Sequence, residues 1–195
     1  MEKLPVYILA GGKSRRFGRD KARVEISGQP LLVNVAGLLK PVATKIIIVA
    51  DRAGKYRDLG FETIADRLPG LGPLGGLQAA LSHCREGWLL CASCDRIGIR
   101  PGWLQALFAG RKDGVKAVLF RGSIWQPLPG LYHASLAPEV DAAVAAGRLT
   151  PWTLLEQTDT VALELPDDWG TSLDINDPGE LEKVASKGGK PWPER

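Results

Sequence analysis

The chain has 195 residues, which is enough for one ordinary domain and too few for two large ones. Hydrophobic residues make up 45% and charged residues 24%, a balance typical of a folded globular protein rather than a disordered chain. The net charge of +3 is too small to indicate a nucleic acid or a membrane surface as partner. We find neither a bilayer-spanning apolar stretch nor a signal-peptide pattern, so we expect a cytoplasmic protein.

Segments with strand and helix character alternate along the first half of the chain. The β-branched run at residues 44–50 predicts a strand buried on both faces, and apolar residues recur every three or four positions from Leu74 to Cys84, as on one helix face. Gly72 and Pro73 mark the start of that helix. The elements expected in this half are strands at residues 4–10, 44–50 and 88–93 and helices at residues 30–39 and 73–84.

The second half continues the alternation. Thr150 and Pro151 supply the N-cap and first-turn proline of a short helix, and Asp177 with Pro178 begins the last one. The elements expected here are strands at residues 116–120, 127–132 and 159–165 and helices at residues 101–109, 135–146 and 151–157. The whole pattern predicts an α/β fold, a three-layer sandwich around a mostly parallel, Rossmann-like sheet. We expect one domain at residues 1–186 and a disordered tail at residues 187–195.

Cys91 and Cys94 form a C-x-x-C pattern, which raises a zinc or redox hypothesis. They lie in an apolar run that predicts a buried strand, and residues three apart in a strand point to opposite faces. A second ligand pair is also missing, because the remaining cysteine and histidines are Cys84, His83 and His133. We therefore interpret both cysteines as small buried side chains.

The stretch from Leu9 to Lys21, directly after the first predicted strand, combines glycines with five cations. Glycine lets backbone N–H groups come close to an anion, so the stretch predicts a polyphosphate site. It is not a P-loop, because Tyr7 stands where that pattern needs the glycine preceding Gly12, and its glycines lack the dinucleotide spacing. The simpler alternative is a strand-to-helix loop with solvated basic side chains. The five cations are Lys13, Arg15, Arg16, Arg19 and Lys21.

A nucleotide site also needs a carboxylate for a metal ion, and Asp95 is placed for that role. It follows the strand at 88–93, so in a parallel sheet it lies on the same edge as Gly11 and Gly12. A carboxylate there suits Mg²⁺, with phosphate and water oxygens completing the coordination. Asn176, near the last strand-to-helix junction, offers a further oxygen. The simpler alternative for Asp95 is an exposed loop aspartate.

At this point the sequence resembles a known family. The stretch from Leu9 to Lys21 is similar to the first motif of sugar-nucleotide-type nucleotidyltransferases, in particular of the molybdenum cofactor guanylyltransferases. The similarity covers the chain to about residue 185. Further motifs in the same order are Asp66, Gly72-Pro-Leu-Gly-Gly-Leu77, Cys94-Asp95, Gln126-Pro-Leu-Pro-Gly-Leu-Tyr132 and Leu173-Asp-Ile-Asn-Asp-Pro178.

The resemblance implies a fold of the nucleotide-diphospho-sugar transferase type and transfer of GMP from GTP to the phosphate of molybdopterin. It implies release of pyrophosphate and a requirement for Mg²⁺. The first hundred residues would form the nucleotide-binding half, and residues 101–186 the acceptor half. Possible recipients of the product are molybdoenzyme apoproteins or cofactor chaperones. The family usually has Asp-x-Pro after the metal aspartate, whereas Asp95-Arg96-Ile97 lacks the proline, so the conformation of this loop is left open.

The resemblance also implies roles for particular residues. Arg15, Lys21 and Asp95 would be the catalytic residues, with Arg15 and Lys21 on the triphosphate and Asp95 on the metal. Trp125, Gln126 and Pro127 are assigned to the acceptor, although packing of Trp125 against the sheet is the alternative. The expected nucleotide-binding residues are Leu9, Ala10, Gly11, Gly12, Ser14, Lys21, Asp66, Gly72, Pro73, Leu74, Gly75 and Asp95.

Two other functions stay open. A cytidylyltransferase, or a nucleotidyltransferase for a different phosphorylated acceptor, would use the same motifs. A non-catalytic carrier that binds GTP or the cofactor is the alternative from another class. The presence of both Lys21 and Asp95 argues against the carrier, because a pure binder has less need of a metal carboxylate.

Overall fold

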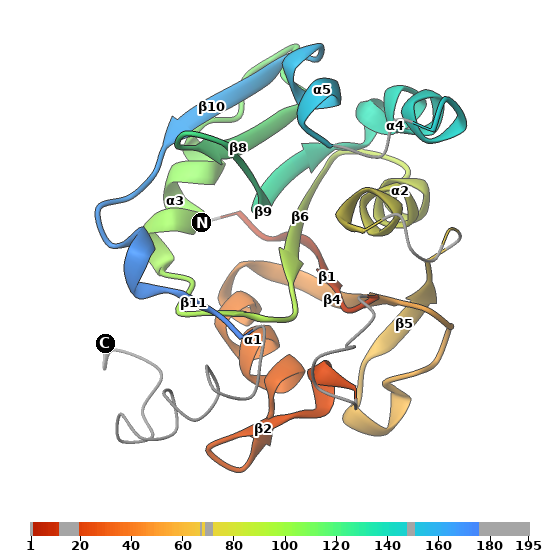
Figure 1. The fold of residues 1–195 in the computed structure, drawn as a ribbon, viewed down its shortest axis with the longest axis vertical. Helices are drawn as coiled ribbons and strands as arrows, with labels where there is room; N and C mark the ends of the chain where they lie inside the picture. Colours follow the sequence, from red (N-terminus) through yellow and green to blue (C-terminus); the bar gives the residue numbers. More distant parts are fainter. Residues whose placement is uncertain (1, 12–19, 67, 69–71, 148–150, 176–195) are drawn as a thin grey trace.

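The computed structural model describes residues 2–11, 20–66, 68, 72–147 and 151–175. Within these residues, seven strands form one sheet in the order β10-β8-β9-β6-β1-β4-β5 (Figure 1). These strands are β1 (Leu4–Leu9), β4 (Ala43–Ala50), β5 (Glu62–Ala65), β6 (Trp88–Ser93), β8 (Ala117–Arg121), β9 (Trp125–His133) and β10 (Thr160–Glu164). The α-helices are α1 (Leu31–Leu39), α2 (Pro73–Cys84), α3 (Pro101–Ala109), α4 (Ala137–Ala145) and α5 (Pro151–Glu156).

The sheet is mostly parallel, as the sequence predicts. β1 pairs in parallel with β4 and β6, β4 with β5, and β10 with β8, whereas β9 runs antiparallel to both of its neighbours. The registers place Leu9 opposite Val49 of β4 and opposite Ser93 of β6. The carboxyl ends of these three strands therefore meet at one edge of the sheet.

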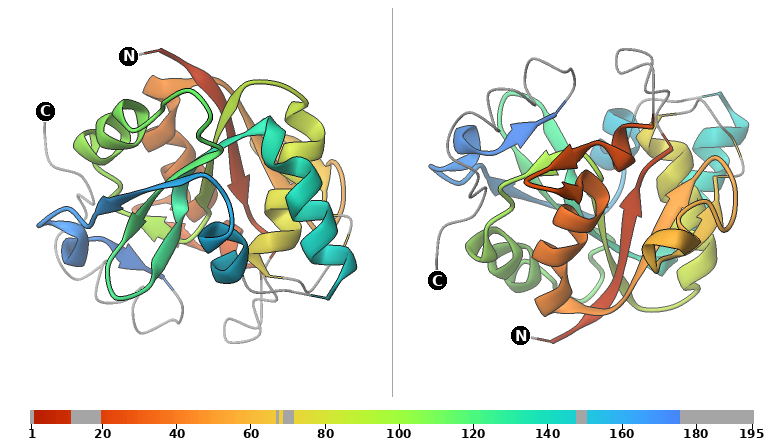
Figure 2. Two further views of the ribbon diagram at one scale, coloured as in Figure 1. Left: turned by 90° about the horizontal axis from the view of Figure 1, so that it is seen from above. Right: turned by 90° about the horizontal axis from the view of Figure 1, so that it is seen from below.

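Helices cover both faces of the sheet, which makes three layers (Figure 2). Buried side chains of α1 and α3 join one apolar core, and those of α2, α4 and α5 join the other. Alternate residues of β1 divide between the two cores, with Val6 and Ile8 in the first and Tyr7 in the second. This alternation is the two-residue period of a strand that is buried on both faces.

The two cysteines of the C-x-x-C pattern lie in different cores. Cys91 of β6 packs with α2, whereas Cys94 packs on the α1 side. Burial raises the pKa of the Cys94 thiol to about 12, with a smaller contribution from the charge of Asp95. Both thiols are buried and free, so the interpretation as small apolar side chains is confirmed.

Two short antiparallel pairs complete the described strands. β2 (Glu25–Ile26) and β3 (Gln29–Pro30) form a hairpin before α1, and β7 (Arg96–Ile97) pairs with β11 (Leu173–Asp174).

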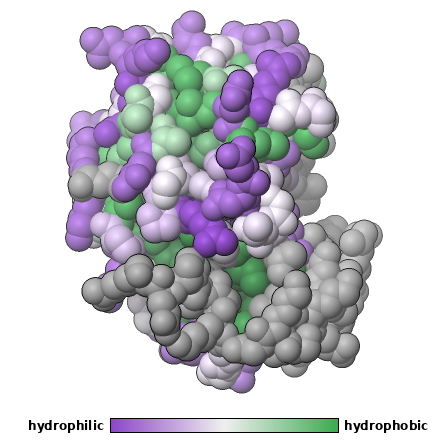
Figure 3. Space-filling view, turned by 90° about the vertical axis from the view of Figure 1, so that its left-hand side faces the viewer, coloured by the Kyte–Doolittle hydropathy of each residue, from purple (hydrophilic) through white to green (hydrophobic). Residues whose placement is uncertain are grey.

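In the part of the chain that the structure describes, no helix is long and apolar enough to cross a membrane. The surface beside β10 and α3 mixes hydrophilic side chains with smaller apolar areas (Figure 3).

Most predicted elements are present with ends shifted by one or two residues. The helix predicted at 135–146 is divided into a 3₁₀ turn, η4 (Ala134–Leu136), and α4. The prediction missed β5, a four-residue edge strand with exposed side chains at both ends and one buried side chain, Thr63. The helix predicted after Asp177 and the tail at 187–195 lie outside the described residues.

Gly130 of β9 tests how tightly the sheet is packed. A Cβ at this position would lie 2.3 Å from Leu119 Cδ2 and 2.7 Å from the Pro127 carbonyl oxygen. We expect Gly130→Ala to lower the free energy of unfolding by about 1–3 kcal/mol in urea titrations, because the added methyl group would force the Pro127 backbone and the Leu119 side chain to move. Gly37→Ala is the control, since Gly37 is exposed within α1 with open space around it, and it should stabilise by about 0.5–1 kcal/mol. Equal unfolding midpoints for the two variants would contradict this packing.

Candidate active site

The predicted catalytic edge lies where β1, β4 and β6 end. From β1 the chain passes through α1 to β4 and β5, and it then returns through α2 to β6 on the other side of β1. Because α1 and α2 cover opposite faces, the carboxyl ends of β1 and β6 border a topological switch point, where open α/β sheets bind ligands. Backbone hydrogen bonds extend the pairing beyond the strands: Ala10 donates to Val49 at 2.8 Å, and Cys94 donates to Leu9 at 3.1 Å.

Lys21 and Asp95, predicted as catalytic residues from separate motifs, are in direct contact. Lys21 Nζ donates to Asp95 Oδ2 at 2.7 Å, and both side chains are largely shielded from solvent. They are 74 positions apart in sequence, and they come together because β1 and β6 are adjacent strands of the sheet. The cation predicted for phosphate oxygens and the carboxylate predicted for a metal therefore lie at the same point of the sheet edge.

Asp20 fixes the backbone beside Lys21. Its Oδ1 accepts from the Ala22 N–H at 3.1 Å, and the buried Tyr56 hydroxyl donates to its carboxylate at 3.1 Å. Lys55 Nζ adds an ion pair at 3.3 Å. Burial, and then the charge of Asp20, raise the pKa of Tyr56 above its ordinary value of 10.0, so the phenol remains a donor.

The anchoring role of Asp20 was not predicted from the sequence. Its one local signal is the position of Asp20 before the short helix η1 (Lys21–Arg23), where an aspartate caps the free N–H groups. The contact with Tyr56 joins residues 36 positions apart and has no sequence signal of its own.

Asp66 lies between the first glycine motif and the start of α2. The Asp66 N–H donates to the Ala50 carbonyl at 2.6 Å, which places this residue at the end of β4. Its carboxylate accepts from the Leu68 N–H at 3.0 Å and is 8% exposed. A Cβ on Gly75 would lie 3.0 Å from Asp66 Oδ1, and one on Gly11 would lie 3.6 Å from Oδ2. The two glycines let the backbone approach this carboxylate from both sides.

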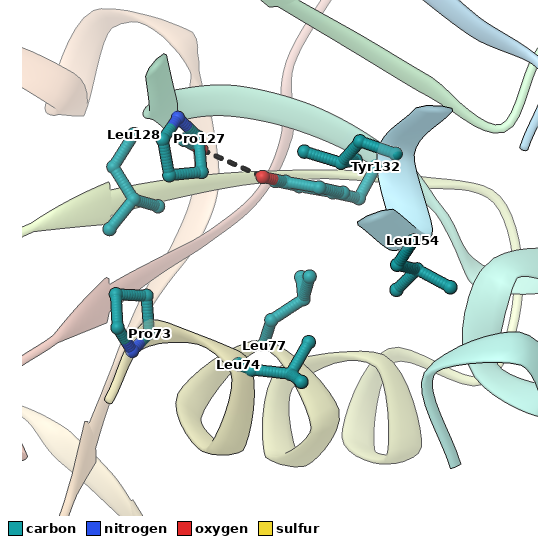
Figure 4. Close-up of a pocket in the computed structure, with 8 residues that line it drawn as sticks. Pro73, Leu74, Leu77, Pro127, Leu128, Tyr132 and Leu154 are labelled. Carbon is teal, nitrogen blue, oxygen red and sulfur yellow. Dashed lines mark hydrogen bonds between the residues drawn. The ribbon is translucent and has the colours of Figure 1, made fainter. Parts of the chain in front are cut away.

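The start of α2 also borders an apolar pocket that faces β9 and α5 (Figure 4). Gly72 precedes α2 with a φ of 61°, a conformation that suits glycine. Pro73 and Leu74, predicted for the nucleotide, meet Pro127, predicted for the acceptor, in this pocket, and the Tyr132 hydroxyl donates to the Pro127 carbonyl at 2.7 Å. The lining residues are Pro73, Leu74, Leu77, Pro127, Leu128, Tyr132, Leu154 and Leu155.

Trp125 is buried against one face of the sheet and is not exposed at the surface. Its side chain is 5% exposed and belongs to the core beneath α2, and the Arg121 guanidinium carbon lies 4.7 Å from the indole centre. This is the packing that the alternative interpretation describes. Gln126 is half-buried beside it. Contacts of Trp125, Gln126 and Pro127 with an acceptor stay predictions.

The loop after Asp95 is held by the C-terminal strand. Arg96 and Ile97 form β7 and pair with β11, and the Ile175 N–H donates to the Asp95 carbonyl at 3.0 Å. Pairing with β11 therefore defines the backbone conformation of this loop, which lacks the proline that is usual in the family.

Several predicted site residues cannot be placed. Gly12, Ser14, Arg15 and Asn176 lie outside the described residues, so their roles stay predictions.

The residues present fit a magnesium ion better than a zinc ion. Among the described residues, no group of three or more His, Cys, Asp or Glu side chains could hold a metal. Zinc in a structural site needs such a set, whereas Mg²⁺ bound with a nucleoside triphosphate takes one or two carboxylates and completes its shell with phosphates and water. Asp95 meets that requirement at the sheet edge.

Comparison with known proteins gives the class that this fold and site define. A family model described as a MobA-like NTP transferase domain matches residues 6–161. The chain belongs to this family of nucleotidyltransferases.

Individual relatives are similar over nearly the whole chain. The "Probable molybdenum cofactor guanylyltransferase" of Deinococcus radiodurans is 36% identical, with 95% of each chain covered. The molybdenum cofactor guanylyltransferase of Pseudomonas paraeruginosa is 32% identical over 91% of this chain and 92% of its own. The crystal structure of molybdopterin-guanine dinucleotide biosynthesis protein A from Archaeoglobus fulgidus has a TM-score of 0.78 at 26% identity and covers 94% of this chain and 98% of its own.

Gly75 tests the contact between Asp66 and α2. Its missing side chain leaves room for the Asp66 carboxylate and the Leu68 carbonyl, which would lie 3.0 and 3.1 Å from a Cβ. We expect Gly75→Ala to displace Asp66 and weaken binding of GTP, used as the probe, by about tenfold or more in calorimetric titrations. Gly102→Ala, in the first turn of α3 with open space around it, should bind GTP like the unmodified chain. Unchanged GTP affinity in Gly75→Ala would contradict a role for this contact.

Proposed function

We propose that this protein transfers GMP from GTP to the phosphate of molybdopterin, forming molybdopterin guanine dinucleotide and pyrophosphate with the help of Mg²⁺. The observation that carries the proposal is the 2.7 Å contact between Lys21 and Asp95 at the β1–β6 edge. The names of the relatives that match over nearly the whole chain support the choice of GTP and molybdopterin.

The reaction needs no general base from the protein, because the acceptor phosphate is already an anion at neutral pH. One of its oxygens forms a bond to the α-phosphorus of GTP, and the bond from that phosphorus to the bridging oxygen of the β-phosphate breaks. Pyrophosphate leaves with the electron pair. The barrier arises from bringing two anions together, so positioning and charge neutralisation carry the catalysis.

The described histidines are engaged away from the carboxyl edge of β1 and β6. The Tyr7 hydroxyl hydrogen-bonds His83 Nδ1 at 2.9 Å, and the Ser135 hydroxyl hydrogen-bonds His133 Nδ1 at 2.8 Å. This arrangement agrees with a mechanism in which no histidine accepts a proton from the nucleophile.

Lys21 and Asp95 divide the electrostatic task. The Lys21 ammonium and the Asp95 carboxylate neutralise each other in their ion pair, which holds both side chains at the sheet edge. In the substrate complex, the Lys21 ammonium would bind phosphate oxygens and offset the charge that develops on pyrophosphate, and the Asp95 carboxylate would hold Mg²⁺. A bound Mg²⁺ supplies Lewis-acid stabilisation of phosphate oxygens. Arg15 would add a second cation on the triphosphate.

We propose that a molybdoenzyme apoprotein or a cofactor chaperone takes up the dinucleotide product. Both the transfer of GMP and this uptake would take place in the cytoplasm. Co-purification of this protein with such a recipient, dependent on bound product, would test this part of the proposal.

The function is tested by incubating the purified protein with Mg²⁺, molybdopterin and GTP or CTP labelled at the α-phosphate. We expect label to pass from GTP to molybdopterin with one pyrophosphate released for each transfer. Transfer from CTP alone would identify a cytidylyltransferase instead. Tight GTP binding without pyrophosphate release would identify a carrier.

The role of Lys21 is tested by Lys21→Ala. Loss of one preorganised cation should lower the rate of GMP transfer by roughly 10²-fold or more, measured under single-turnover conditions. The matched control is Lys45→Ala, because Lys45 forms an exposed ion pair with Glu62 at 3.6 Å and should transfer GMP at the unmodified rate. Near-normal transfer by Lys21→Ala would refute the assignment.

A further inference from the structure

Arg96 is a buried cation next to the predicted metal carboxylate. Its side chain donates two hydrogen bonds to Asp174, from Nε to Oδ1 at 2.8 Å and from Nη2 to Oδ2 at 2.6 Å. The residue is 9% exposed, and its guanidinium carbon lies 4.4 Å from the centre of the Trp169 ring. Its Nη1 is buried without a hydrogen-bond partner among the described residues. A bidentate carboxylate and an aromatic face together leave this guanidinium one orientation.

Trp169 is itself fixed to the body of the protein. It lies in the 3₁₀ turn η5 (Trp169–Thr171), and its ring stacks on that of Trp103 of α3 with 4.7 Å between centroids. Trp103 Nε1 donates to Asp168 Oδ1 at 2.7 Å, just before this turn. The surface against which Arg96 packs is therefore rigidly attached to α3.

The backbone around Asp95 depends on the same contacts. Asp174 lies opposite Arg96 in the β7–β11 pair, and the Ile175 N–H donates to the Asp95 carbonyl at 3.0 Å. Gly98 lies close to Ser172, since a Cβ on Gly98 would be 3.3 Å from the Ser172 Cα. The side chain of Arg96 thus holds β11, and the residue directly after β11 hydrogen-bonds to the main chain of Asp95.

On the basis of the proposed function, we propose that Arg96 is a positioning residue that acts through Asp174 and β11 to direct the Asp95 carboxylate toward Lys21 and the metal. Arg96 does not touch the substrate in this role. Asp95 stands on a two-residue connection between β6 and β7, so a small rotation of its backbone would displace the carboxylate that lies 2.7 Å from Lys21. Misplacement of a reacting group by about 1 Å can lower a rate by about 10²-fold.

The test separates positioning from stability by replacing both partners. Removing Asp174 alone takes the bidentate partner from the buried Arg96 guanidinium, which destabilises the fold whatever else the pair does. The double variant Arg96→Met with Asp174→Asn removes both charges with little change in side-chain volume, and its urea unfolding midpoint should stay close to that of the unmodified chain. We expect this double variant to bind the Mn²⁺ complex of GTP about tenfold or more weakly, measured by electron paramagnetic resonance. Its kcat for GMP transfer should fall by about 10- to 100-fold.

Two further variants serve as controls. Arg111 donates one hydrogen bond to Glu2 at 2.9 Å, and its guanidinium carbon lies 4.9 Å from the centre of the Phe108 ring, so it too combines a carboxylate partner with an aromatic face, in a more exposed pair. Arg111→Met with Glu2→Gln should therefore leave Mn²⁺ binding and kcat unchanged. Arg96→Lys keeps the charge without the bidentate geometry and should give intermediate values.

Each outcome decides the proposal. Unchanged Mn²⁺ affinity and unchanged kcat in the folded double variant would overturn it, and so would unchanged values in Arg96→Lys if the double variant failed to fold. The Mn²⁺ measurement needs no turnover. If the unmodified chain transferred no GMP, the proposed function would fail while this measurement still decided the role of Arg96.

Discussion

The contact between Lys21 and Asp95 can form only because β6 returns beside β1. That return requires the chain to cross from one face of the sheet to the other, with α1 on one side and α2 on the other. Once β1 and β6 are neighbours, the end of the cation-rich stretch and the carboxylate after β6 share one edge. Other contacts serve this arrangement, because Asp20 fixes the backbone at Lys21 and β11 fixes the backbone at Asp95.

The central part of the fold follows from local patterns. Runs such as residues 46–50 and 88–93 are apolar enough to be buried on both faces, and this property predicts parallel strands between two helical layers, although Thr44 and Lys45 at the start of β4 are exposed. The sequence also predicts that Asp95 lies on the same edge as Gly11, because parallel strands carry their carboxyl ends to one side. The two-residue period of a strand likewise predicts that Cys91 and Cys94 lie on opposite faces of the sheet, as they do.

Contacts between distant residues could not be predicted in this way. β5 was missed because a four-residue edge strand with half its side chains exposed gives a weak apolar pattern. The pairing of Arg96 with Asp174 spans 78 positions, and neither residue has a spacing or neighbour that predicts the other. The antiparallel direction of β9 follows from its hairpin with β8. The strands predicted at residues 116–120 and 127–132 leave a longer gap than the three connecting residues that the structure has, so the hairpin was not recognised.

The central claim is that Lys21 and Asp95 act as one unit on the same nucleotide. A double-mutant cycle tests it most directly, with Lys21→Met and Asp95→Asn made singly and together and the rate of GMP transfer measured for each. Residues that act as a unit are strongly non-additive, so the double variant should be about as slow as the slower single variant. Fully additive losses, with the two factors multiplied in the double variant, would contradict the account.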